Sequence, residues 1–261
     1  MDRSPLDADV LRGVLRATDF RLYDVVEETG STNADLIARA AAGEPIAGAV
    51  LLAEHQTAGR GRHGRSWSAP PRSQISMSVA VHATGVPPQA WGWLPLLTGL
   101  AVAQTVRELD VDAGLKWPND VLVGGAKLAG ILAEVSGAVI VVGLGLNVSL
   151  TADELPDPNA VSLSMLGHDD VDRTALAVLV LGAMSERVAQ WRDGDSAALA
   201  ADYRAMSTTI GTRVRAILPG DAEIVGIATG IDDSGRLLID DAGTEVTVAA
   251  GDITHLRPAS D

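Results

Sequence analysis

The amino-acid sequence predicts an α+β protein, in which a mixed β-sheet with helices is followed by a smaller β-rich unit. Helix-like apolar spacing and apolar runs of strand length alternate through most of the chain. From Gly211 the pattern changes to short alternating segments separated by turns rich in Gly, Pro and Asp. The length of 261 residues exceeds a typical domain of about 100–200 residues. We therefore expect a large unit over residues 1–208 and a small unit over residues 209–261.

The first part of the chain contains clear helix and strand signals. Residues 7–18 have the apolar spacing of a short amphipathic helix. The run Ser31-Thr32-Asn33 precedes Leu-Ile and an alanine-rich stretch, which predicts an N-capped helix to about Ala42. Residues 49–53 are continuously apolar, as in a buried strand, and residues 74–81 alternate as in a half-buried strand.

The remaining elements follow from the same two periodicities and from turn residues. The large unit is expected to continue with a helix at 95–109, a turn at 118–120, a hairpin at Gly124-Gly125, a returning strand from Lys127, a buried strand at 139–142 that ends in the segment 143–147, and helices at 172–191 and 196–206. The small unit is expected to form a β-barrel from strands at 213–218, 223–229, 236–240, 244–249 and 252–257. Because no low-complexity linker separates them, the two units should pack together.

Composition excludes several classes of function. A formal net charge of −14 argues against broad nucleic-acid binding, which needs many Lys or Arg contacts to phosphates. No apolar run reaches the roughly 18 residues that span a bilayer, and the N-terminus lacks a signal-peptide pattern. The absence of cysteine excludes disulfides and thiolate catalysis. We expect a cytoplasmic protein.

Only two of the 20 Lys and Arg residues are lysines, and these two, Lys116 and Lys127, flank the sequence Trp117-Pro118-Asn119-Asp120. Lysine carries a compact ammonium with a tunable pKa, whereas the arginine guanidinium is a planar fork. A lysine retained in an arginine-rich chain therefore indicates a point-charge role. Chance retention explains the count alone equally well, and it is the neighbouring motif that favours a function.

A glycine and arginine segment, Gly59-Arg60-Gly61-Arg62-His63-Gly64, formally matches the dinucleotide-binding pattern G-x-G-x-x-G. The context does not fit, because polar residues precede the segment and Pro70-Pro71 follows it where a helix should begin. Together with Arg65, its guanidiniums are instead suited to gripping carboxylate and phosphate oxygens. The alternative is an exposed, solvated arginine loop.

Five motifs occur in a fixed order along the chain: Ser31 to Asn33, Gly59 to Trp67, Lys116 to Asp120, Lys127 to Leu132, and Gly143 to Asn147. Together they closely resemble the motifs of biotin protein ligases, and with the β-rich tail the resemblance covers about residues 25–258. The resemblance implies the mixed-sheet fold shared with lipoate ligases and class II aminoacyl-tRNA synthetases, followed by an SH3-like barrel.

The resemblance also implies an activity. Such an enzyme activates biotin with ATP to biotinyl-5'-AMP and then transfers the biotinyl group to a lysine of a biotin carboxyl carrier domain. Cations are needed where the two anionic substrates meet. The implied partner is the carrier domain of acyl-CoA or pyruvate carboxylases, with no nucleic acid or membrane partner and a monomeric state. Mg²⁺ is expected through the ATP phosphates, and no residue is assigned as its ligand.

Site residues are carried over position by position. The resemblance implies catalytic roles for Lys127, which would bridge the biotin carboxylate and the α-phosphate, for Arg62 and for Asp120. The implied biotin site comprises Ser31, Thr32, Asn33, Gln56, Gly59, Arg60, Gly61, Arg62, Lys127 and Gly130. The implied ATP site comprises Arg62, Arg65, Trp67, Asn119, Lys127 and Asn147, with Trp67 and Asn147 near the adenine.

Other interpretations remain open at this point. Ser31 to Asn33 also fits a simple helix cap, residues 117–120 fit a rigid turn, and Asn147 fits a side chain bonded to backbone. The rival enzyme is a lipoate ligase, which uses the same activation chemistry. A biotin-sensing DNA-binding regulator is disfavoured, because only thirty residues precede Ser31 and we expect no N-terminal DNA-binding domain.

Overall fold

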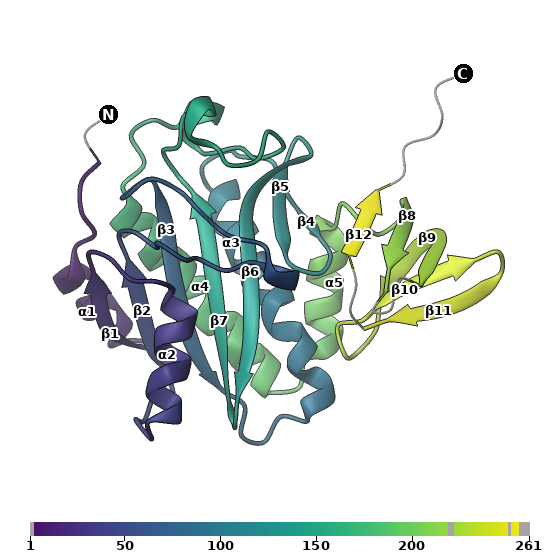
Figure 1. The fold of residues 1–261 in the computed structure, drawn as a ribbon. Coiled ribbons are helices and arrows are strands. Elements are labelled where there is room, and N and C mark those ends of the chain that lie inside the picture. The colour runs from purple at the N-terminus through teal and green to yellow at the C-terminus, as the bar shows by residue number, and fades with distance from the viewer. Residues whose placement is uncertain (1–2, 219–221, 250–251, 256–261) are drawn as a thin grey trace.

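The computed structural model describes residues 3–218, 222–249 and 252–255 (Figure 1). The α-helices are α1 (Ala8–Leu15), α2 (Thr32–Ala41), α3 (Trp93–Arg107), α4 (Arg173–Arg192) and α5 (Ser196–Met206). The strands are β1 (Arg21–Val26), β2 (Ala49–Ala53), β3 (Gln74–His82), β4 (Ala113–Lys116), β5 (Asp120–Val123), β6 (Ala126–Ser136), β7 (Val139–Asn147), β8 (Arg213–Ile217), β9 (Glu223–Ile231), β10 (Leu237–Asp241), β11 (Thr244–Val248) and β12 (Asp252–His255).

The large unit is built on a seven-stranded mixed sheet with the strand order β1-β2-β3-β7-β6-β5-β4. Strands β1 and β2 run parallel, and the other neighbours are antiparallel. At the centre, β3 pairs with β7 from Gln74 opposite Asn147 to His82 opposite Val139. These two strands therefore bring together segments far apart in sequence, and they form the rigid floor on which the site is built.

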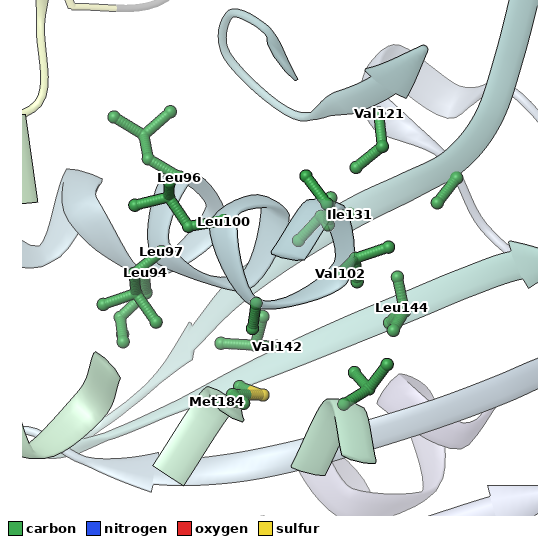
Figure 2. Close-up of a cluster of buried hydrophobic side chains, with 14 of the residues drawn as sticks. Leu94, Leu96, Leu97, Leu100, Val102, Val121, Ile131, Val142, Leu144 and Met184 are labelled. Carbon is green, nitrogen blue, oxygen red and sulfur yellow. The ribbon is translucent and has the colours of Figure 1, made fainter. Parts of the chain in front are cut away.

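Helices cover the two faces of this sheet unequally. Helices α1, α3, α4 and α5 pack on one face and enclose the main core, whereas α2 alone covers part of the other face through a smaller cluster around Leu36 (Figure 1). Figure 2 shows part of the main core, where Val102 of α3 lies with Ile131 of β6, Val142 and Leu144 of β7 and Met184 of α4. The sheet area next to α2 is consequently left for loops and ligands.

Polar side chains begin four of the helices, and the cap predicted for the helix after Ser31 is confirmed. The side chains of Asp7, Ser31, Asp172 and Asp195 accept hydrogen bonds from backbone N–H groups in the first turns of α1, α2, α4 and α5. Such caps satisfy donors that the helix itself leaves unpaired and contribute about 1 kcal/mol each. Helix α3 instead is buried on almost every side, so packing rather than capping fixes it.

The small unit is a five-stranded antiparallel sheet in the order β11-β10-β9-β8-β12. Its turn at residues 232–236 contacts the large unit, because the indole N–H of Trp93 donates to Asp233 O at 2.8 Å and that of Trp117 donates to Gly235 O at 3.0 Å. The segment before β8 also runs along edge strand β4, where Thr208 N donates to Leu115 O. The expected packing of the two units is confirmed.

One prediction of strand length is wrong. The strand expected at residues 139–142 continues to Asn147 as β7, through the glycine-rich segment that was expected to end it. Its backbone is hydrogen-bonded to β3 on one side and to β6 on the other, which holds the glycines extended. The expected turn at residues 219–221 and the last two residues of the expected strand at 252–257 lie outside the described residues.

Candidate active site

A cavity of about 450 Å³ opens on the α2 side of the sheet, beyond the first turn of that helix. Its size falls in the range of roughly 300–1,000 Å³ that small-molecule sites occupy. The walls come from the start of α2, from the segment between β2 and β3, and from strands β6 and β7. In Figure 1 that segment crosses in front of β7 and β6. Residues distant in sequence therefore face one space.

The floor of the cavity is made by glycines of β7. Because successive residues of a strand face opposite sides, Val142 and Leu144 enter the core while Gly143 and Gly145 face the cavity. A Cβ atom on Gly143 would lie 2.4 Å from Asn33 Oδ1, and one on Gly145 would lie 2.3 Å from the Trp67 ring. Glycine is thus required at both positions, because Asn33 and Trp67 lie directly on the strand.

The glycine and arginine segment forms a small hairpin. Trp67 N donates to Gly59 O at 2.8 Å and Gly61 N donates to Arg65 O at 2.7 Å, and Arg65 N closes the turn on Arg62 O. The two central turn residues have positive φ, 55° at His63 and 72° at Gly64. This is the pattern of a two-residue type I′ turn, whose twist matches paired strands. We call residues 59–67 the arginine hairpin. Its backbone is hydrogen-bonded, but Arg60 and residues 63–66 are exposed, so the geometry alone does not exclude the alternative of an exposed, solvated arginine loop.

Hydroxyl and amide groups gather at the start of α2. The Thr32 backbone N–H donates to Gln56 Oε1 at 2.9 Å, and the Ser78 hydroxyl donates to Asn33 Oδ1 at 2.6 Å. Ser31, Thr32 and Asn33 are all buried. Ser31 also caps α2 through Ala34 N, so its helix-cap role is real. Cap and cavity wall are the same residues here, and the two interpretations do not exclude each other.

Cationic groups from β6 and from the arginine hairpin also line the cavity. Lys127 Nζ forms an ion pair with Asp120 Oδ1 at 2.7 Å and lies 5.4 Å from the centre of the Trp67 ring. Arg62 donates to Asn119 Oδ1 at 3.3 Å and Arg60 donates to Glu134 Oε2 at 2.9 Å. Gly130 allows Lys127 to fold back, since a Cβ there would lie 3.0 Å from its Nζ. The cavity can therefore neutralise anions at one end.

Two side chains near these cations serve the framework. The Asn147 amide donates to Val161 O at 3.1 Å and to Lys127 O at 3.5 Å, so it connects the end of β7 to neighbouring backbone. This agrees with the alternative interpretation of Asn147 as a side chain that bonds to backbone. Burial, and secondly the charge of Asp120, raise the pKa of Tyr203. Tyr203 therefore stays a neutral phenol beneath Asp120.

Every residue predicted for the biotin and ATP sites lines this cavity, with one exception. Gly59 lies outside it, at the base of the hairpin, where a Cβ would stand 2.3 Å from Trp67 O. Sequence reasoning missed Ser78 and Glu134, which bind Asn33. Ser78 had a detectable signal, a serine repeated on the apolar strand 74–81, whereas nothing in the sequence marks Glu134.

Within residues 3–218, 222–249 and 252–255, no group of three or more His, Cys, Asp or Glu residues is arranged to hold a metal ion. Over the same ranges, no helix combines the length and apolar character needed to cross a bilayer.

Comparisons with known proteins match the chain to one family. Residues 26–149 match the Biotin/lipoate A/B protein ligase family, and residues 209–256 match the Biotin protein ligase C terminal domain. The chain is 54% identical to the biotin--[acetyl-CoA-carboxylase] ligase of Mycobacterium tuberculosis, over 98% of this chain and 97% of that one. It is 31% identical to the bifunctional ligase/repressor BirA of Escherichia coli, over 97% of this chain and 79% of that one.

A solved structure agrees in fold. The structure of a biotin protein ligase from Aquifex aeolicus in complex with biotin and ATP is similar with a TM-score of 0.76 and 26% identity, covering 91% of this chain and 99% of that one.

Proposed function

The chain belongs to the biotin protein ligases, and from that membership we propose how its cavity works: the α2 end binds biotin, and the cationic end joins the biotin carboxylate to ATP. The activity is that of an ATP-dependent biotin–[acetyl-CoA-carboxylase] ligase, and its protein partner is a carboxylase carrier. The observation that carries the site assignment is that Lys127 and Arg62 line the same small cavity as the uncharged polar side chains at the start of α2.

In the first step, a carboxylate oxygen of biotin attacks the α-phosphorus of ATP and pyrophosphate leaves. Both reactants are anions, so the ammonium of Lys127 and the guanidinium of Arg62 would reduce their repulsion and stabilise the charge that develops. Each such preorganised donor contributes on the order of 3 kcal/mol. To act, Lys127 would exchange part of its contact with Asp120 for the substrate oxygens.

In the second step, the amine of a carrier lysine attacks the acyl carbon of biotinyl-5'-AMP, loses a proton, and releases AMP. Asp120 lies on the cavity wall and would become available to orient this amine once Lys127 has turned to the substrates. The ordered arginine hairpin would keep water from the reactive anhydride between the two steps.

The polar cluster at the α2 end accounts for the choice of acid. Ser31, Thr32 and Asn33 with Gln56 supply hydroxyl and amide groups for the ureido ring of biotin, whereas the ring of lipoate offers no such partners. A site with buried polar groups rejects an analogue that leaves them unpaired. For the nucleotide, Trp67 offers an aromatic face beside Gly145, and Asn119 with Arg65 lies near the phosphate end.

The finer assignments belong to the same proposal. Mg²⁺ would enter with the ATP phosphates and add positive charge there, with Asp120 and Asp157 as the carboxylates on the cavity wall that fit its preference for one or two such ligands. We also propose that residues 1–208 and 209–261 are the catalytic and C-terminal domains, that the enzyme acts as a cytoplasmic monomer without nucleic acid, and that acyl-CoA or pyruvate carboxylases supply the carrier.

Exchange of labelled pyrophosphate into ATP tests the function. We expect exchange that depends on biotin and that lipoate does not support, followed by transfer of biotin to an added carboxyl carrier domain. Exchange with lipoate in place of biotin would favour the lipoate ligase alternative. A protein that shows no exchange with either acid would refute both.

A further inference from the structure

One carboxylate joins two parts of the proposed biotin site. Glu134 Oε2 accepts a hydrogen bond from Asn33 Nδ2 at 2.8 Å and another from Arg60 at 2.9 Å. Asn33 belongs to the first turn of α2, Arg60 to the arginine hairpin, and Glu134 to β6. A single oxygen atom on the sheet therefore holds the hairpin and the helix in one arrangement.

The bond to Glu134 also sets the orientation of the Asn33 amide. Its Nδ2 donates both to Glu134 and to Leu132 O at 3.1 Å, and its Oδ1 accepts from Ser78 at 2.6 Å. An ionised carboxylate only accepts hydrogen bonds, so the amide nitrogen must face Glu134. Both donors are then used, and Oδ1 keeps one acceptor position for an N–H group of a ligand in the cavity.

Glu134 itself is placed outside the substrate cavity. It lines a neighbouring cavity of about 1050 Å³ on the other side of the arginine hairpin, whereas Asn33 and Arg60 line the 450 Å³ cavity. Its side chain is 27% exposed. Arg60 lines both cavities, so Glu134 contacts the substrate cavity through the two residues that it binds.

We propose that Glu134 is a positioning residue of the ligase reaction, which fixes Asn33 for the ureido ring and fastens the arginine hairpin over the bound acyl-adenylate. This inference rests on the proposed function, because it presupposes that biotin lies beside Asn33. Two separate effects follow. Loss of the Asn33 contact weakens biotin binding, and loss of the Arg60 contact lets the intermediate escape.

The test compares the Glu134→Ala and Glu134→Gln variants with the wild-type protein. We measure KM for biotin in pyrophosphate exchange and the rate at which biotinyl-5'-AMP leaves the enzyme when no carrier is present. For E134A we expect both quantities to rise about fivefold, as suits hydrogen bonds to a partly exposed charge, with kcat for exchange within about twofold of wild type. E134Q keeps an acceptor oxygen, so KM for biotin and the rate of adenylate release should rise less in this variant than in E134A.

A double-mutant cycle separates the two routes. In an Arg60→Ala background, adding E134A should change adenylate release by less than about twofold, since the contact is already gone. The KM for biotin should still rise, because the Asn33 contact is still lost. If Glu134 were needed only for folding, E134A would change KM for biotin and adenylate release together, with or without Arg60.

Asp19→Ala is the matched control, because Asp19 pairs with Arg192 at 2.7 Å away from both cavities and should leave KM and release unchanged. Unaltered KM and release in E134A would overturn the proposal, and so would slower release, which would mean that Glu134 draws Arg60 away from the substrate. If E134A does not fold, E134Q decides between these outcomes. Absence of biotin-dependent exchange in the wild-type protein would instead refute the proposed function.

Discussion

At the scale of single residues, three neighbours define the position of Lys127 in the cavity. Its ammonium is held between the Asp120 carboxylate at 2.7 Å and the face of Trp67 at 5.4 Å, and Gly130 leaves the space in which its side chain folds back. A guanidinium is broader and planar, so it cannot take this position without moving one of these neighbours. The surroundings thus explain why a lysine occurs here in an arginine-rich chain.

Replacing Lys127 by alanine should lower biotin-dependent pyrophosphate exchange at least about a hundredfold, because the charge between the two substrates is lost. Replacement by arginine should recover only a small part of that loss. Arg192→Ala serves as the control, since it removes a cation paired with a carboxylate at the same 2.7 Å but outside the cavity. Exchange at the wild-type rate in K127A would contradict the role assigned to the ammonium.

Gly145 is the second position where one atom decides the geometry. An alanine there places its Cβ in the Trp67 ring, so we expect a loss of about 1–3 kcal/mol in unfolding free energy and a higher KM for ATP. Urea denaturation and exchange kinetics measure the two effects. Gly182 in α4 has no atom within 4 Å of its Cβ position, and Gly182→Ala should stabilise the helix by about 0.5–1 kcal/mol. Equal behaviour of the two alanine variants would refute the steric argument.

At the scale of elements, the arginine hairpin depends on its turn. His63 and Gly64 both adopt positive φ, which glycine tolerates without cost and which other residues adopt uncommonly, although histidine does so more often than most. Backbone bonds between Gly59 and Trp67 and between Gly61 and Arg65 hold the two arms of the hairpin together. The hairpin is therefore a cationic element whose shape is set by backbone conformation.

Gly64→Ala isolates that backbone contribution, because no atom lies within 4 Å of the added Cβ and only the φ of 72° is strained. We expect a penalty of about 1 kcal/mol confined to the hairpin, seen as severalfold faster release of biotinyl-5'-AMP with an unchanged melting temperature. Gly85→Ala, with a φ of 83° and equally open space, provides the same penalty in the turn after β3. If both variants release the adenylate equally fast, the hairpin is not the barrier to release.

Elements were also the scale at which the sequence was most informative. The cap and periodicity of α2 are local, so its position follows from the sequence. The alternation of residues 74–81 also identified β3, but the half-buried strand expected there is wrong, because all eight residues are buried between neighbouring strands and the layers on both faces. The order of the sheet does not follow from the sequence, since the pairing of β3 with β7 joins segments about seventy residues apart through backbone groups that every residue carries. The extension of β7 through Gly143 and Gly145 was missed because glycine usually interrupts strands.

In the site, too, the sequence revealed local features but not contacts between distant segments. Motifs identified the residues that surround the cavity, because those residue types at those spacings carry the chemistry. The contact of Lys127 with Asp120 and that of Glu134 with Asn33 depend on the register of β5 and β6 and on how the hairpin lies on the sheet. Neither is encoded locally.

At the scale of the whole molecule, the small unit holds the part of the cavity wall that follows β4. Trp117 stands two residues before Asn119 and three before Asp120. Its N–H donates to Thr209 Oγ1 at 3.1 Å, and its indole donates to Gly235 O. The turn that supplies Gly235 is itself fixed by Asp232, which accepts from Ser234 N and Arg236 N, both at 2.9 Å. The geometry at Asp120 is thus coupled to the C-terminal unit.

This coupling has a pH signature. Burial raises the pKa of Asp232, but hydrogen bonds from Arg236 and Ser234 outweigh it and leave the pKa lowered. A carboxyl group with a lowered folded-state pKa stabilises the fold above its unfolded pKa of about 4, and that contribution disappears as the pH falls through the folded-state value. Asp232→Asn should therefore melt about 2 °C below wild type at pH 7, with the difference shrinking below about pH 4.

Melting curves from pH 7 to pH 3 measure that difference. Asp241→Asn makes the same change of charge on an exposed residue of β10 and should follow the wild-type curve throughout. A difference between D232N and wild type that stays constant down to pH 3 would show that the carboxylate charge does not stabilise the turn.

The bare floor at Gly143 and Gly145 sets a limit on redesign. A binding site is commonly enlarged by trimming side chains, but at Gly143 and Gly145 strand β7 has none to trim, and the backbone beneath belongs to a strand paired on both sides. A bulkier biotin analogue can gain room only from what rests on that floor, which means Asn33 at one end or Trp67 at the other. A smaller residue in place of Asn33 would weaken recognition of biotin, and one in place of Trp67 would remove the ring over which the Lys127 ammonium lies.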